Sequence, residues 1–521
     1  MRFRFVADAS RVDVTQRDTL FLWNTDWDDW FQFATLHTLV YIDQQGTRHS
    51  LGDVKIGTVG LLGARANQAA AGERMPGLPT EFSVLSEEFF SLGQDDSYYS
   101  NLDELGAQFR EDVLRGLRDI AFDELARRTA LFQKVTTTSL LRSVTLKTVE
   151  DQFARMAHGG ARLTPYSFSF KPRSAEPRPA LAFSVEPGSR PPTNIHVLIG
   201  RNGVGKSTLL NSMAKVMVEK SRADDDPAGP WDQLSNIVSV SFSAFDDFSP
   251  MKQSRERPRG LTYHYVGLKK VAGRDSESAG LKDDRAISTE MTKSLKLCLV
   301  GARRARLRQA LGLLESDPIF AEAGLADLLE IPLPHEVPTS FDFDEAVTAF
   351  GAQFRGLSSG HKIVLLSICR LVETVEEKSL VLLDEPEAHL HPPLLSAFVR
   401  ALSDLLTNRN GMAIIATHSP VVLQEVPRVC VWKLSRSGTF VQVERPRIET
   451  FGENVGILTD EVFGLEVTST GFHRMLADAA LSSGSYEEAL ATFGGQLGSE
   501  GKSMLRAMML PTHSATSYVD G

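Results

Sequence analysis

The stretch Leu198–Leu210 reads LIGRNGVGKSTLL and contains the pattern GxxxxGK[ST] between Gly200 and Ser207. An apolar run, Ile195–Ile199, leads into it, and helix-forming residues follow it. A strand, a glycine-rich loop and a helix in this order let backbone N–H groups surround a phosphate at the start of the helix. The sequence therefore predicts a nucleotide-binding loop in an α/β fold.

Each side chain of this loop has an expected task. Lys206 is expected to reach the β- and γ-phosphates, and Ser207 is expected to bind Mg²⁺. Further contacts to the phosphates are expected from Asn202, Gly203, Gly205 and Thr208. ATP and Mg²⁺ are accordingly the cofactors that the sequence predicts.

A second apolar segment, Ser379–Leu383, ends in the acidic pair Asp384 and Glu385. Its aliphatic and β-branched residues predict a central parallel strand that is buried on both faces. Asp384, at the carboxyl end, is expected to hold Mg²⁺ directly or through water, and Glu385 to orient and polarise the attacking water. Downstream of a phosphate loop, this strand and its two acids predict nucleotide hydrolysis.

Two further motifs lie on either side of the acidic pair. Leu357–His361 reads LSSGH and opens a helical segment, and Ala413–Pro420 reads AIIATHSP, an apolar strand with His418 just past its end. Together with the loop and the acidic pair, these motifs resemble the ABC-type ATPases over roughly residues 160–465. In that family LSGGQ is the signature motif and the strand-end histidine is the switch. Ser358 and Gly360 keep the signature's serine and glycine, whereas His361 replaces its glutamine.

The resemblance implies an α/β fold, namely an ABC-type P-loop ATPase head with a helical lobe inserted at about 286–350. It implies catalytic roles for Glu385 and His418. It also implies that Ser358 and Gly360 face the γ-phosphate bound by another copy, because a helix N-terminus offers free N–H groups to an anion. One chain has a single loop and a single signature, so we expect a head-to-tail homodimer or a larger homo-oligomer.

The residues after the acidic strand indicate the branch of the family. Asp384–Pro392 reads DEPEAHLHP, where transporter heads usually read DEPTSALD; this resembles the branch with SMC proteins, RecF, the OLD nucleases and anti-phage ATPases. Residues 451–465 resemble a block in defence ATPases of the Septu PtuA kind. His389 and His391 could be a zinc pair, but no third or fourth ligand lies nearby in the sequence, which favours a contact across the dimer interface.

The segment between loop and signature is far shorter than the heptad arms of SMC proteins. A strand is expected over Asn236–Ser243, but no glutamine follows directly, which leaves Asp246 and Gln253 as candidates for the family's Q-loop residue. A polar, glycine-rich loop is expected over 260–285 and helices beyond it.

Residues 1–160 are expected to form a small α/β or α+β domain ahead of the ATPase domain, residues 161–465. Residues 466–521 are expected to be a helical extension with a polar tail. In the first domain, Asp43, Asp53 and Lys55 loosely resemble the PD-(D/E)xK nuclease pattern, although such a triple also arises easily in a hairpin.

Charge and composition limit the partners. The net charge is −10, with 66 acidic and 56 basic residues, so nucleic acid would need a local patch. Arg303–Arg308, with four arginines, is the densest basic cluster; it is equally consistent with DNA or RNA contact and with a solvated face paired to Glu315 and Asp317. No apolar run is long enough to cross a membrane and no secretion signal is evident, so we expect a cytoplasmic protein without membrane contact.

Three functions remain open on these grounds. The first is the ATPase or sensor subunit of a prokaryotic anti-phage defence complex that controls a separate nuclease or toxic effector. The second is a RecF- or SMC-like DNA repair or chromosome ATPase that binds DNA directly. The third is an ABC transporter head, whose motifs fit least well.

Overall fold

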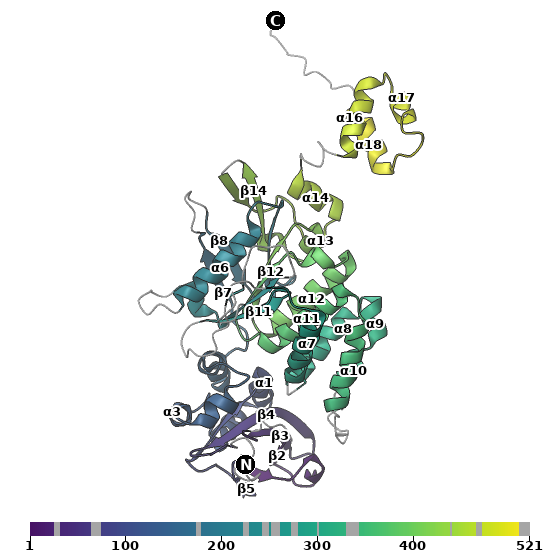
Figure 1. Ribbon diagram of the computed structural model, residues 1–521. Coiled ribbons are helices and arrows are strands. Elements are labelled where there is room, and N and C mark those ends of the chain that lie inside the picture. The colour runs from purple at the N-terminus through teal and green to yellow at the C-terminus, as the bar shows by residue number, and fades with distance from the viewer. Residues whose placement is uncertain are drawn as a thin grey trace.

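The computed structural model describes residues 1–25, 32–63, 74–172, 179–221, 229–241, 250–251, 261–271, 280–299, 302–329, 343–437, 440–464 and 471–509. The purple N-terminal part, the teal and green central part and the yellow C-terminal helices follow one another along the molecule in Figure 1.

The N-terminal part is built on a six-stranded sheet with the order β5-β1-β2-β3-β4-β6. Its strands are β1 Arg2–Phe5, β2 Thr19–Asn24, β3 Leu36–Ile42, β4 Arg48–Thr58, β5 Glu81–Phe82 and β6 Phe89–Gly93. Its helices are α1 Asp96–Glu104, α2 Ala107–Gly116, α3 Glu124–Leu131, α4 Leu146–Thr148 and α5 Ala154–Ala157. The helices follow the strands in sequence and pack with them around one apolar core, so this part is an α+β unit.

The central part is built on a seven-stranded sheet with the order β11-β10-β12-β13-β9-β14-β15, in which only the pairing of β15 with β14 is antiparallel. Its strands are β9 Ile195–Gly200, β10 Asn236–Ser241, β11 Thr262–Gly267, β12 Leu380–Asp384, β13 Met412–Thr417, β14 Val431–Ser437 and β15 Phe440–Glu444. A separate antiparallel hairpin is formed by β7 Tyr166–Phe170 and β8 Leu181–Val185.

Helices cover both faces of this sheet, as Figure 1 shows. They are α6 Lys206–Lys220, α7 Asp284–Cys298, α8 Ala302–Leu314, α9 Pro318–Ala323, α10 Phe343–Gly356, α11 Ser359–Thr374, α12 Pro392–Asn408, α13 Pro420–Leu423 and α14 Val455–Phe463. Helices α7 to α10 form the lobe inserted between the phosphate loop and the signature. This is the ABC-type P-loop ATPase head that the motifs predicted.

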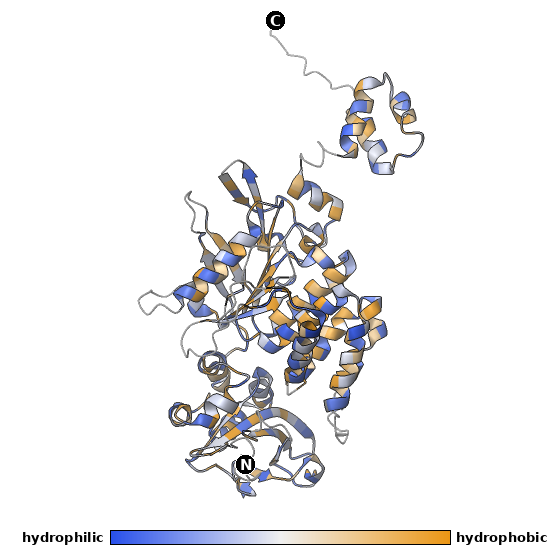
Figure 2. Ribbon diagram, viewed as in Figure 1, coloured by the Kyte–Doolittle hydropathy of each residue, from blue (hydrophilic) through white to orange (hydrophobic). Residues whose placement is uncertain are grey.

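The two faces of the sheet have separate cores because strand side chains alternate. Val197 and Ile199 of β9 point to the face covered by α7, α8, α11 and α12. Leu198 points to the opposite face, which α6 and the β7–β8 hairpin cover. Apolar residues therefore fill the middle strands on both sides, and these strands are mostly orange in Figure 2.

One expectation is wrong. Residues 260–285 were expected to be a loop, but Thr262–Gly267 forms β11, which pairs in parallel with β10 at the edge of the sheet. Tyr263, Tyr265 and Val266 are buried there. The strand is short and has glycine-rich and charged sequence on both sides, so its local composition resembles a loop, and burial against the sheet decides its conformation.

The C-terminal helices are α16 Phe472–Ser482, α17 Tyr486–Ala491 and α18 Ser499–Met508. They pack on one another around Leu476, Ala489 and Leu505. The expected polar tail lies outside the described residues. Among the residues that the structure does describe, no helix is both long and apolar enough to cross a membrane.

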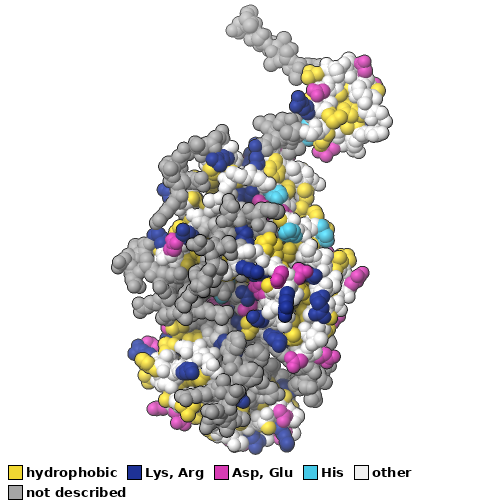
Figure 3. All heavy atoms as spheres, viewed as in Figure 1, with side chains coloured by type: hydrophobic (Ala, Val, Ile, Leu, Met, Phe, Trp, Pro, Cys, Tyr) yellow, Lys and Arg dark blue, Asp and Glu magenta, His cyan; other side chains and the backbone are white. Residues whose placement is uncertain are grey.

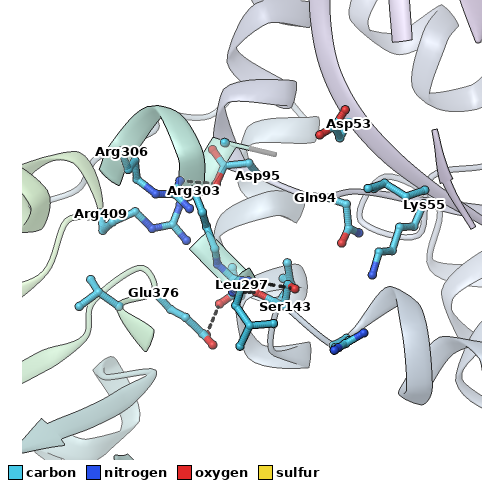
Figure 4. Close-up of a pocket in the computed structure, with 16 residues that line it drawn as sticks. Asp53, Lys55, Gln94, Asp95, Ser143, Leu297, Arg303, Arg306, Glu376 and Arg409 are labelled. Carbon is cyan, nitrogen blue, oxygen red and sulfur yellow. Dashed lines mark hydrogen bonds and ion pairs between the residues drawn. The ribbon is translucent and has the colours of Figure 1, made fainter. Parts of the chain in front are cut away.

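Buried charges join the N-terminal part to the ATPase head. Asp95, at the start of α1, pairs with Arg306 of α8 and lies 3.5 Å from the Arg409 guanidinium. Asp96 accepts hydrogen bonds from Arg409 at 2.9 Å and from Arg162 at 2.7 Å. Figure 4 shows Arg306 reaching Asp95 across the pocket between the two parts. This network fixes the first domain against the helical lobe.

The arginine cluster Arg303–Arg308 belongs partly to this boundary. Arg303 donates to the Ser143 hydroxyl and carbonyl at 3.1 and 3.0 Å, and Arg306 pairs with Asp95. The expected pairing with Asp317 is wrong, because Asp317 caps α9 and contacts His361. Figure 3 shows basic and acidic side chains interspersed over the helical lobe.

Asp95→Asn is expected to lower the free energy of unfolding by about 3 kcal/mol at neutral pH, because two largely buried guanidinium groups lose negative charge. Asparagine can still accept the Ser97 N–H that caps α1. Urea unfolding of the full chain checks this. Glu124→Gln is the matched control, since the Glu124–Arg128 pair is exposed and its loss is expected to cost under about 0.5 kcal/mol.

The effect also has an expected pH dependence. Burial raises the pKa of Asp95, but Arg306 and Arg409 outweigh burial and hold that pKa well below its usual range. A lowered folded-state pKa means that the carboxylate stabilises the fold above its unfolded pKa of about 3.9 and stops doing so as pH falls through the folded value. The difference between wild type and Asp95→Asn should therefore shrink in acid. An equal difference at pH 7 and in strong acid would contradict the ion-pair account.

Candidate functional site

Strand register brings the motifs to one edge of the sheet. Asp384 of β12 is in register with Ala416 of β13, and Thr417 of β13 is in register with Ile199 of β9. Because these strands are parallel, their carboxyl ends lie at the same edge. The phosphate loop, the acidic pair and His418 therefore converge there.

The phosphate loop depends on two glycines with positive φ. Gly203 has φ 79°, and Gly205, the residue before α6, has φ 97°, a region that L side chains rarely adopt. Lys206 is buried, and its Nζ donates to the carbonyls of Gly200 at 2.9 Å and Arg201 at 3.0 Å. Burial lowers the pKa of Lys206, and Glu385, Glu387 and Asp384 oppose the shift. The ammonium group thus lies over the loop, where a polyphosphate would be held.

A pair of oxygen atoms at this edge suits a hard cation. The Ser207 hydroxyl donates to Asp384 Oδ1 at 2.8 Å, although the two residues are far apart in sequence. Mg²⁺ prefers carboxylate and hydroxyl oxygens, with water and phosphate completing its shell. The donor set therefore fits the predicted Mg²⁺ ligands, Ser207 and Asp384.

Glu385 has an unusual backbone. Its φ of 45° and ψ of 58° lie in the left-handed region, which costs a residue with a side chain about 1 kcal/mol. Its N–H still donates to the Ala416 carbonyl at 2.9 Å, so the chain turns sharply only after the end of β12. Such strain is concentrated at functional sites because the turn aims a side chain. Here it directs Glu385 to the edge that carries the phosphate loop.

His418 is positioned by a residue that the sequence reasoning missed. Its Nδ1 lies 3.1 Å from Glu387 Oε1 and 3.8 Å from Glu385 Oε1. The same Glu387 oxygen accepts the His418 backbone N–H at 2.7 Å and the Thr417 hydroxyl at 2.5 Å. Glu387 therefore holds His418 beside Glu385. The position of Glu387 within DEPEAHLHP, close to the acidic pair, could have pointed to it. The sequence alone does not show which group Glu387 contacts.

The signature opens α11 with an unusual cap. Ser358 is the N-cap residue, but its hydroxyl accepts no backbone N–H of the first turn; instead its Oγ lies 2.6 Å from the side-chain Nδ1 of His361, in that same turn. Ser358 is exposed and Gly360 is buried. A Cβ on Gly360 would meet the His389 carbonyl oxygen at 2.5 Å, so only glycine fits there. The signature is thus packed against the segment that follows the acidic pair.

The phosphate-loop helix and the signature helix lie on opposite faces of the sheet. Helix α6 packs in the core that contains Leu198 and Leu382, whereas α11 packs in the core that contains Val197 and Leu383. The loop's Lys206 and Ser207 therefore belong to one layer of the head and Ser358 to the other.

The Q-loop candidates Asp246 and Gln253 lie outside the described residues. His391 caps α12 by accepting the Leu394 N–H at Nδ1, at 3.1 Å. Further metal ligands were not expected near His391, and this expectation is wrong. Asp317 and His361 come close to His391 in the fold.

The nuclease pattern is not assembled around one centre. Asp43 binds His49 and Thr47 at the turn between β3 and β4. Asp53 accepts from Thr38 at 2.9 Å, and Lys55 donates to the Ser139 carbonyl at 2.8 Å. Asp53 and Lys55 both line the pocket between the first domain and the head, but Asp43 is not among its lining residues.

Sequence comparisons relate the chain to a family and to two known proteins. Residues 339–424 match the family described as "AAA domain, putative AbiEii toxin, Type IV TA system", a segment that contains Ser358, Asp384 and His418. Over 530 aligned residues the chain is 40% identical to protein ea59 of Escherichia phage lambda, with 98% of each chain covered. It is also 24% identical over 266 residues to UvrABC system protein A of Chlamydia muridarum (strain MoPn / Nigg), covering 45% of this chain and 14% of that protein.

Two solved structures are similar to this chain, with low TM-scores. A metal-chelate type ABC transporter in an inward-facing conformation shares 15% identity and covers 57% of this chain and 88% of its own, with a TM-score of 0.27. The ADP conformation of an ATP-binding cassette of an ABC transporter shares 16% identity and covers 56% and 92%, also with a TM-score of 0.27. Because both TM-scores are low, the fold is identified by the strand order of the sheet and by the phosphate loop. With its phosphate loop and acidic strand in an ABC-like ATPase head, and with its full-length similarity to the phage protein, the chain belongs to the ea59 family.

Proposed function

We propose that the chain binds ATP with Mg²⁺ and hydrolyses it in pockets shared by two copies that close head to tail. The observation that carries this proposal is the 2.8 Å contact between Ser207 and Asp384 at the phosphate-loop edge, in a head whose signature helix covers the opposite face. One copy supplies the loop and the acids, and the other supplies Ser358 and Gly360.

Each residue has a task in this mechanism. Lys206 leaves the carbonyls of Gly200 and Arg201 and binds the β- and γ-phosphates. Ser207 and Asp384 hold Mg²⁺, which when bound neutralises phosphate charge. Glu385 orients and polarises the attacking water, and His418 lies close enough to Glu385 to respond to the γ-phosphate. Release of phosphate removes the charge between the two copies and separates them.

The wider role that we propose is that of a cytoplasmic ATPase subunit in a prokaryotic anti-phage defence complex, similar to the Septu PtuA kind. ATP-bound dimers would hold a separate nuclease or toxic effector inactive. The family description supports this, because its name refers to a toxin and a toxin–antitoxin system. Co-purification of an effector expressed from a neighbouring gene tests it.

A RecF- or SMC-like ATPase that binds DNA directly is the second candidate. The similarity to UvrABC system protein A favours it. Arg303 and Arg306 already contact the first domain, so this role would use Arg308, which is exposed, among the four arginines. ATP-dependent DNA binding that weakens steeply with salt and is reduced by Arg308→Ala would support this candidate over the defence role.

Ser358→Arg tests the shared pocket. A long cation at the exposed start of α11 is expected to prevent closure and to reduce ATP turnover about 100-fold, while each monomer still binds ATP. Turnover and fluorescent-nucleotide affinity are measured side by side on the full chain. The control is Ser482→Arg, an exposed serine at the end of α16 among the C-terminal helices, which should leave both unchanged. A Ser358→Arg protein that dimerises and hydrolyses ATP normally would require a different model of the site.

A further inference from the structure

A buried carboxylate joins the signature to two other helices. Asp317, the N-cap of α9, accepts from the Ile319 and Phe320 backbone N–H groups through Oδ1. The same Oδ1 lies 3.0 Å from His361 Nε2, and Oδ2 lies 3.5 Å from His391 Nε2. Asp317 and His361 are almost completely buried, whereas His391 is half-exposed. The starts of three helices thus meet at one carboxylate.

These three groups are close enough together to hold a metal ion, since one ligand atom from each lies within 4.8 Å of the others. The hydrogen bonds favour a different arrangement. His391 Nδ1 accepts the Leu394 N–H, so the proton of a neutral His391 is on Nε2, the nitrogen that faces Asp317. A metal at Nε2 would have to displace that proton and break the cap of α12. With both Nε2–H groups facing the carboxylate, His361 makes a 3.0 Å hydrogen bond, His391 makes a longer 3.5 Å contact, and the cap of α12 is kept.

The protonation state of His361 determines whether the Ser358 hydroxyl can donate a hydrogen bond to a ligand. With Nε2–H donating to Asp317, a neutral ring has only a lone pair at Nδ1, and the Ser358 hydroxyl must donate its proton there. The serine oxygen would present only lone pairs to a phosphate, which repel it. With a second proton, Nδ1 donates to Ser358 Oγ, and the hydroxyl proton becomes free to bind an anion.

We propose that Asp317 and His361 are positioning residues for the signature and that His361 carries both ring protons when Ser358 meets the γ-phosphate. This rests on the shared-pocket function proposed above. The charged and titratable groups that face His361 are Asp317 from α9 and His391 from the start of α12; Phe320 supplies an aromatic ring at 5.2 Å. Asp317 supplies the compensating negative charge. Burial raises the pKa of Asp317, but the hydrogen bonds from His361 and the backbone leave it below its ordinary value.

Asp317→Asn tests the charge with little change of shape. Asparagine keeps an oxygen at the Oδ1 position, which accepts both α9 amides and His361, so the helix cap remains. We expect the turnover rate to fall about 10-fold at neutral pH while ATP affinity of the monomer stays within about twofold, because the charge that stabilises a protonated His361 is lost. The amide nitrogen that replaces Oδ2 faces His391 Nε2, which is 3.5 Å away on a half-exposed side chain.

His361→Gln is the conservative rescue. A glutamine amide can donate one proton to Asp317 and the other to Ser358 at every pH. The His361→Gln rate is therefore expected to stay close to that of wild type, because both contacts of the ring are kept. A His361→Gln enzyme that turns over ATP at least about 10-fold more slowly than wild type, or an Asp317→Asn enzyme with the wild-type rate, would overturn the proposal.

Two further measurements separate the alternatives. Nitrogen-15 signals of the histidine rings, assigned with His361→Gln, report the protonation of His361 in Glu385→Gln protein saturated with ATP, with no need for turnover. A doubly protonated ring supports the proposal and a neutral ring overturns it. Stoichiometric zinc in purified wild type that is lost in Asp317→Asn would also overturn it, in favour of a metal site. If wild type neither binds nor hydrolyses ATP, the proposed function itself fails.

Discussion

Glu385→Gln is expected to bind ATP as wild type does and to hydrolyse it at least about 100-fold more slowly, because the carboxylate that polarises the attacking water is replaced by an amide. Gln keeps the size and hydrogen-bonding reach of Glu at this left-handed position, so the sharp turn after β12 is retained. Since phosphate is no longer released, closed dimers should accumulate. Single-turnover hydrolysis and light scattering with and without ATP measure the two effects.

A matched control is available on α6, away from the acidic pair. Glu219→Gln removes an exposed carboxylate that pairs only loosely with Lys215, and it should hydrolyse ATP at the wild-type rate. A Glu385→Gln protein that turns over ATP normally would show that another group activates the water. Glu387 would then be the next candidate, because its Oε2 is buried without a hydrogen-bond partner.

Lys206→Ala is expected to weaken ATP binding more than about 100-fold, because a charge-assisted contact to the phosphates is removed from a buried site. The loop should survive, since its glycines and the pairing of β9 with β13 do not depend on the ammonium group. Titration with a fluorescent ATP analogue measures the affinity, and an unchanged unfolding transition would show that the fold is intact.

Lys215→Ala is the control for this variant, because Lys215 lies on the same helix with its side chain largely exposed. Its affinity for ATP should equal that of wild type. If Lys206→Ala binds ATP as tightly as Lys215→Ala does, the loop of Gly200–Ser207 is not the nucleotide site, and the assignment of Asp384 as a Mg²⁺ ligand loses its basis.

The parts of the site that sequence patterns predicted are those fixed by local chain geometry. A loop with GxxxxGK[ST] needs Gly203 and Gly205 at positive φ, and a fully apolar strand that ends in two acids belongs in the middle of a parallel sheet. The 2.8 Å contact between Ser207 and Asp384 follows once both strands join one sheet.

The parts that sequence reasoning missed depend on tertiary packing. Asp317 follows α8 in an unremarkable stretch, and only the packing of α9 and α12 against the start of α11 places it beside His361 and His391. Strand β11 has no strong local pattern and is defined by pairing with β10. Nucleic-acid contact and a solvated face both require the arginines of the helical lobe to be exposed, but Arg303 and Arg306 contact the first domain.

The central claim is that one copy binds the triphosphate and the other completes the pocket, and mixing two inactive variants tests it most directly. Lys206→Ala has an intact signature, and Ser358→Arg has an intact loop. In the mixed dimer the substituted signature faces the loop that binds no ATP, so the space of the missing triphosphate accommodates the long side chain and the dimer can close. When equal amounts are combined, half of the dimers should contain one complete pocket, which predicts recovery of about a quarter of wild-type turnover. A mixture no more active than its two components, or full activity of either variant alone, would contradict the account.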